Sequence, residues 1–127
     1  MAPTAWENSS LLHALLFQKF GNRKIQLKYS LPKINLTHIQ NMTTDFGMIQ
    51  FSKINRPDID SGYTLDDNAR AMIAICQHFG QTNDDEDLKL ISIYLDFIEF
   101  CQQPDGSFLN YVDEYKKFTP QNYETNL

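Results

Sequence analysis

Three segments of the chain place apolar residues at the spacing of an amphipathic helix. The first runs from about Pro3 to Phe20, where Gly21-Asn22 ends it. The second runs from about Thr64 to Gly80, and the third from the acidic cap at 83–87 to Pro104. The spacing predicts two inner faces: Leu65, Ala69, Met72, Ile73, Cys76 and Phe79 in the second helix, and Leu88, Ile91, Leu95, Ile98 and Cys101 in the third.

Shorter patterns connect these helices. Apolar and polar residues alternate from Ile25 to Leu31, which predicts an extended connector that Pro32 ends. Asn35 is a suitable N-cap for a short helix that ends near Thr43. The apolar run from Met48 to Phe51 then leads into a loop of about a dozen residues, and ordered loops of that length are often functional.

The second half of the chain repeats the order of patterns in the first, at an offset of about 60 residues. Residues 47–51 correspond to 106–111 with a one-residue slip, and residues 63–65 correspond to 123–127. An acidic helix start follows Leu65, but the sequence stops at Leu127, so we expect a fragment that lacks its second inner helix. The expected fold class is all-α: an incomplete α/α-hairpin toroid with short extended connectors.

Composition and charge exclude several classes of function. The 127 residues carry 11 basic and 16 acidic side chains, a net charge of −5, and no long basic run, so nucleic acid is not an expected partner. The apolar stretches are too short to span a membrane, and the N-terminus lacks a signal-peptide pattern, which makes the expected location cytoplasmic. Cys76 and Cys101 are expected to be reduced core thiols without catalytic chemistry.

Two segments carry a family resemblance. Residues 62–71, which read GYTLDDNARA, follow residues 44–51, which read TDFGMIQF. Together they resemble the α/α-toroid domain associated with bacterial family 4-type glycosyltransferases. The turn at 102–108, QQPDGSF, is similar to turns between hairpins in many α/α toroids, including glycan-processing and terpene-cyclising enzymes. The resemblance covers residues 31–127.

The chain is expected to consist of two parts. Residues 31–127 are expected to be the first hairpins of a truncated toroid domain. Residues 1–30 are expected to form an N-terminal helix and an extended linker. Residues 1–20 also resemble the last helix of a GT-B glycosyltransferase, so a preceding glycosyltransferase domain is the expected neighbour. The Glu-x7-Glu motif and the nucleotide-sugar pocket of such a transferase are not among these residues.

The candidate catalytic residues are Asp66 and Asp67, at the start of the helix within the family-like segment. In a toroid the inner helices direct their N-termini at a central cavity, where paired carboxylates can bind sugar hydroxyls or act as acid and base. Arg70 joins them as a candidate substrate-binding residue. The alternative is structural, because carboxylates cap helix N–H groups and Arg70 lies within ion-pair reach of both.

The loop before this helix supplies three further candidates for substrate binding. Asp58, Asp60 and Tyr63 offer hydrogen-bonding and stacking groups that suit a sugar, although a solvated turn would use the same residues. The spacing from Asp58 to Gly62 is too short for a calcium loop, and the three histidines share no ligand spacing. Neither a metal nor a cofactor is expected.

Three functions remain open at this point. In the first, the chain is part of a carbohydrate-active toroid domain linked to a glycosyltransferase, contacts a glycan in the intact protein and is inactive alone. In the second, it is a noncatalytic helical scaffold or docking module, with Asp66, Asp67 and Arg70 purely structural. In the third, it is part of a glycoside hydrolase, phosphorylase or sugar epimerase.

Overall fold

The computed structural model describes residues 11–15 and 30–124. Residues 11–15 are helical, while the rest of the helix expected from Pro3 to Phe20 and nearly all of the connector expected from Ile25 to Leu31 lie outside the described residues. The chain divides into two units, residues 1–33 and residues 34–127. The fold described below is that of the second unit.

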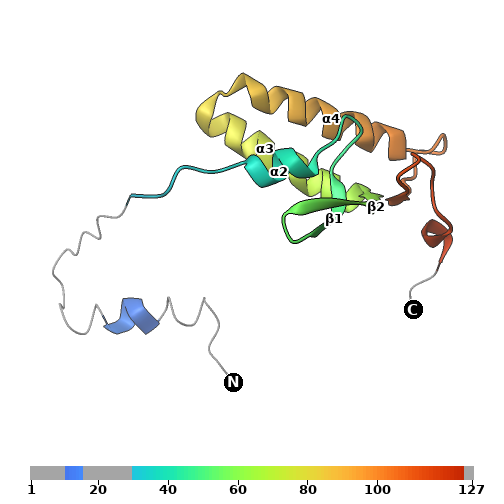
Figure 1. The fold of residues 1–127 in the computed structure, drawn as a ribbon. Coiled ribbons are helices and arrows are strands. Elements are labelled where there is room, and N and C mark those ends of the chain that lie inside the picture. The colour runs from blue at the N-terminus through green and yellow to red at the C-terminus, as the bar shows by residue number, and fades with distance from the viewer. Residues whose placement is uncertain (1–10, 16–29, 125–127) are drawn as a thin grey trace. The chain divides into compact units, whose positions relative to one another are not determined.

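The second unit combines α-helices with a three-stranded antiparallel sheet of order β1-β2-β3 (Figure 1). The expected all-α fold class is therefore wrong, and the architecture is mixed α and β. Along the chain the elements are α2 (Thr37–Met42), β1 (Ile49–Lys53), β2 (Arg56–Thr64), α3 (Leu65–Thr82), α4 (Asp85–Cys101), β3 (Tyr111–Val112) and the 3-10 helix η1 (Pro120–Tyr123).

Strand β2 occupies the segment that the sequence predicts as a loop. Pro57, which pairs with Ser52 of β1, has no N–H to give to a sheet ladder. It is tolerated because β3 pairs with β2 only at Tyr63 and Thr64, so the other side of Pro57 needs no donor. The register of β1 against β2 is also irregular between Ile49 and Phe51. A proline and an irregular register remove the alternation by which a strand is recognised.

Helices α3 and α4 begin where the sequence predicts, because their caps are local. The Thr64 hydroxyl accepts a hydrogen bond from the Asp67 N–H at 3.2 Å and caps α3. The Asp84 carboxylate accepts from the Glu86 N–H at 3.0 Å and caps α4. Helix α3 continues two residues beyond Gly80 and ends where Asn83 adopts a left-handed conformation, φ 53°.

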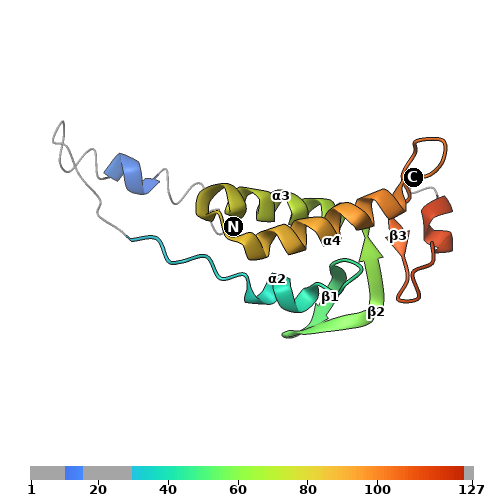
Figure 2. The same ribbon diagram turned by 90° about the horizontal axis from the view of Figure 1, so that it is seen from above.

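The buried faces of α3 and α4 differ from the predicted ones. Helix α2 and the start of β1 pack against one side of the pair formed by α3 and α4, as Figure 2 shows. The core lies between them. Ile73, Leu88 and Leu95 were expected inside, but they are 57%, 46% and 54% exposed. The residues that face the core are Asn68, Ala71 and Ile75 of α3, and Asp87, Tyr94, Phe97 and Cys101 of α4.

The turns matched by the internal repeat have similar closures. An isolated antiparallel bridge joins Thr43 to Met48 in the first turn and Gln102 to Phe108 in the second. The second turn is one residue longer, in agreement with the one-residue slip of the alignment. Gly106, at φ 88°, supplies the left-handed residue that this longer turn uses.

A buried polar pair joins the two long helices. The Asp87 carboxylate is 2% exposed, and its Oδ2 lies 2.5 Å from Nδ1 of His78. We expect His78→Ala to lower the free energy of unfolding by about 2–3 kcal/mol, because the substitution leaves the buried Asp87 carboxylate without its hydrogen-bond partner. Urea denaturation at neutral pH measures the change.

The control for this pair is a double-mutant cycle with Asp87→Leu. Removing both partners should cost less than the sum of the two single substitutions, since no uncompensated charge remains in the double variant. Additive effects would show that the pair contributes no interaction energy.

Candidate functional site

The residues predicted at the start of α3 are engaged in holding the helix end. The Thr64 hydroxyl donates to Asp67 Oδ2 at 2.5 Å while it caps the Asp67 N–H. Asn110 accepts hydrogen bonds from the two amides that precede Asp67. Its carbonyl oxygen accepts from Leu65 N–H at 2.9 Å, and its Oδ1 accepts from Asp66 N–H at 3.1 Å. All three N–H groups of the first turn therefore have partners within the protein.

Asp66 and Arg70 form a surface ion pair. Their Oδ2 and Nη2 atoms lie 3.1 Å apart at the i, i+4 spacing, with both side chains more than half exposed. Exposed pairs of this kind contribute roughly 0.3–0.5 kcal/mol to stability. Asp66, Asp67 and Arg70 thus make the cap and the ion pair that would be expected if their role is to stabilise the start of α3.

The candidates in β2 separate into two groups. Asp58 pairs with Lys53, with 3.4 Å between Oδ1 and Nζ, and lies outside the pocket described next. Asp60 and Tyr63 both line that pocket. The structure therefore brings two of the six predicted site residues together in one concave site.

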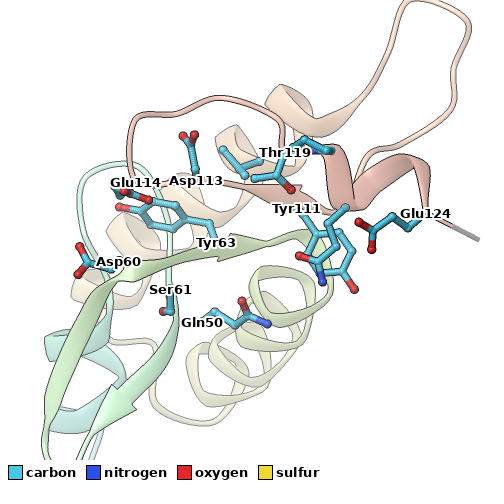
Figure 3. A pocket seen from close by; sticks show the side chains of 12 residues that line it. Gln50, Asp60, Ser61, Tyr63, Tyr111, Asp113, Glu114, Thr119 and Glu124 are labelled. Carbon is cyan, nitrogen blue, oxygen red and sulfur yellow. The ribbon is translucent and has the colours of Figure 1, made fainter. Parts of the chain in front are cut away.

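The pocket has a volume of about 510 Å³ and lies where β2, β3 and η1 meet (Figure 3). Cavities of this size commonly hold small organic ligands. Its carboxylates are Asp60, Asp113, Glu114 and Glu124, and its aromatic side chains are Tyr63 and Tyr111. The remaining lining residues are Gln50, Ser61, Val112, Thr119, Pro120 and Gln121.

Asn122 fixes one wall of the pocket. Its Oδ1 accepts from the N–H groups of Asn110 at 2.9 Å and Tyr111 at 2.7 Å. Its Nδ2 donates to the carbonyl oxygens of Tyr111 at 2.7 Å and Thr119 at 3.0 Å. This one side chain thereby ties η1 to β3 and sets the position of the lining residues on both.

The two tyrosines have different roles in the wall. Tyr63 is 7% exposed, its ring lies edge-on to Phe46 at 5.0 Å, and its hydroxyl lies 3.0 Å from the Thr44 hydroxyl. Most of this ring belongs to the core, so it offers a ligand little surface. Tyr111 is half-buried and is the better aromatic contact.

Comparison of the chain with protein-family models, with curated proteins and with solved structures gives no match. In residues 11–15 and 30–124 no helix has both the length and the apolar character that a membrane crossing requires.

Potential metal ligands and thiols are dispersed over the part of the chain that the structure describes. There, no group of three or more His, Cys, Asp or Glu side chains is arranged to hold a metal ion. Burial raises the pKa of the Cys101 thiol to about 11, which keeps it protonated and unreactive at neutral pH. Cys76 was expected in the core but is exposed, and both cysteines are free thiols.

Sequence reasoning missed four carboxylate or aromatic residues of the pocket: Tyr111, Asp113, Glu114 and Glu124. It also missed Asn110 and Asn122, which position the wall. These residues lie in the short elements β3 and η1 and in the turns beside them, where no apolar period indicates a direction for the side chains. The one available signal was the density of Asp, Asn and Glu residues between Asn110 and Glu124.

Proposed function

We propose that this chain is the glycan-contacting part of a carbohydrate-active protein associated with a glycosyltransferase. The observation that carries the proposal is the pocket between β2, β3 and η1. It combines carboxylate and amide groups, which bind sugar hydroxyls, with the half-buried ring of Tyr111, on which a sugar face can pack.

Two further features support this assignment. The sequence predicts Asp60 and Tyr63 as sugar contacts, and both line this pocket. The wall is also preorganised, because Asn122 makes four hydrogen bonds that fix β3 and η1 before any ligand arrives.

The proposed role is binding, with no bond made or broken at the start of α3. Asp67 is engaged with Thr64, and Asp66 with Arg70. These contacts favour the scaffold interpretation for that helix end, which is compatible with a glycan contact in the separate pocket.

Titration of the chain with neutral oligosaccharides, followed by calorimetry, tests the proposal. We expect Asp60→Asn to weaken binding by about tenfold, the loss of roughly one charge-assisted hydrogen bond. Asp58→Asn is the matched control, because it makes the same chemical change two residues earlier in β2 but outside the pocket.

Asp66→Asn is the second control, and it separates the pocket from the helix start. Both control variants should bind the oligosaccharide as the unchanged chain does. A tenfold loss with Asp66→Asn, and none with Asp60→Asn, would move the glycan site to the start of α3. Absence of binding by the unchanged chain would reject the proposal.

A further inference from the structure

We infer that the pocket selects its glycan by charge: it accepts sugars that carry a protonated amine, tolerates neutral sugars and rejects anionic ones. This inference rests on the proposed function and adds the class of sugar. It is drawn from the charges that line the cavity and from their distribution along it.

The charged side chains that line the cavity are all acidic. Four residues with carboxylates line the cavity, Asp60, Asp113, Glu114 and Glu124, and none of its lining residues is Lys, Arg or His. The chain as a whole has a net charge of −5, so its field does not oppose the local one. An anionic group in this cavity would meet like charge, and no residue of the lining would supply a compensating cation.

The carboxylates are spread along the cavity. Figure 3 shows Asp60 and Glu124 at opposite ends, with Tyr63 and Tyr111 between them. No three of these carboxylates, and no other such group among the described residues, are close enough together to hold a metal ion. A single small cation would therefore satisfy only part of the site, whereas an elongated ligand with several polar groups can reach both ends.

One of the carboxylates is held in place by the backbone. Asp113 Oδ1 accepts from the N–H groups of Tyr115 and Lys117, each at 2.9 Å. These bonds close the turn that carries both Asp113 and Glu114. The negative charge at this wall is thus positioned before binding, and a ligand amine gains attraction without having to order the loop.

The test compares three disaccharides on the full 127-residue chain: one of glucosamine, its N-acetylated counterpart and one of a uronic acid. Calorimetry is done at slightly acidic pH, where the sugar amine is protonated. We expect the amine-bearing sugar to bind about three- to tenfold more tightly than the N-acetylated one, the range of a partly exposed ion pair. The uronic acid should show no binding.

Salt and substitution separate charge selection from general loss of affinity. Raising the salt concentration should reduce the ratio of the two affinities towards one, because exposed charges are screened. The double variant Glu114→Gln/Glu124→Gln should reduce the same ratio, even if the affinity for both sugars falls. Asp58→Asn should leave this ratio unchanged.

The outcomes distinguish the two proposals. Equal binding of amine-bearing and N-acetylated sugars would overturn charge selection and leave the glycan contact standing. Binding of none of the three sugars would overturn both. Equal competition by a simple diamine without a sugar ring would show a general cation site, and it would overturn the assignment to amine-bearing sugars.

Discussion

Replacing Gly62 with alanine is expected to lower the free energy of unfolding by about 3–5 kcal/mol, because two separate costs act on one methyl group. Gly62 has φ 72°, which L-residues rarely adopt, and a Cβ built there lies 2.4 Å from the Val112 carbonyl oxygen. The methyl group would force β3 away from β2, and β3 carries one wall of the pocket. Chemical denaturation should show the loss of stability, and the oligosaccharide binding that we propose for the pocket should disappear with it.

Two other glycines provide the controls for this substitution. Gly106→Ala places a methyl group in open space but keeps the unfavourable φ of 88°, so it should cost only about 1–2 kcal/mol. Gly80→Ala meets neither problem, since it lies within α3 with nothing near its Cβ, and it should stabilise the protein by about 0.5–1 kcal/mol. Equal losses at Gly62 and Gly106 would show that contact with β3 contributes nothing.

Asn68→Leu is the second substitution for which we expect a large effect, a loss of about 3–5 kcal/mol. Asn68 is fully buried in α3, and its Oδ1 accepts from the Met48 N–H at 2.7 Å. Its Nδ2 donates to the carbonyl oxygens of Met48 at 3.2 Å and Thr64 at 2.8 Å. Leucine has a similar volume but leaves both polar groups of the Met48 backbone without this partner.

Asn41→Leu is the matched control for Asn68→Leu. Asn41 is exposed in α2, so the same chemical change there should stay within about 0.5 kcal/mol of the unchanged protein. Thermal or urea unfolding of both variants gives the comparison. If Asn68→Leu were as mild as Asn41→Leu, the loop before β1 would not depend on the buried amide.

Local contacts set where α3 and α4 begin, whereas distant contacts decide which faces of these helices are buried and pair strand β2. The positions of α3 and α4 were predictable because their caps, Thr64 and Asp84, act within three residues of themselves. The buried faces were not, because they depend on where α2 and β1 pack, and Ile73 is as apolar as Ile75. Strand β2 was missed because its evidence lies in β1 and β3 rather than in its own pattern.

The candidate site likewise combines residues that could be predicted locally with a pocket that depends on distant segments. Asp60 could be selected from its own chemistry, but the pocket exists only because residues 111–124 return to β2. Within residues 62–71 the sequence predicts Asp66 and Asp67 as catalytic residues. Asn68 beside them is the residue on which the packing depends, and its importance follows from burial, which no single position in a sequence reveals.

The dependence of α3 on Asn110 has a consequence for spectroscopy. The Leu65 and Asp66 amides are bonded to a segment that lies more than forty residues later, while later amides of α3 bond within the helix itself. In hydrogen–deuterium exchange these two amides report whether residues 109–124 remain docked. Rapid exchange at both, with slow exchange one turn further along, would reveal an open pocket in an otherwise intact helix.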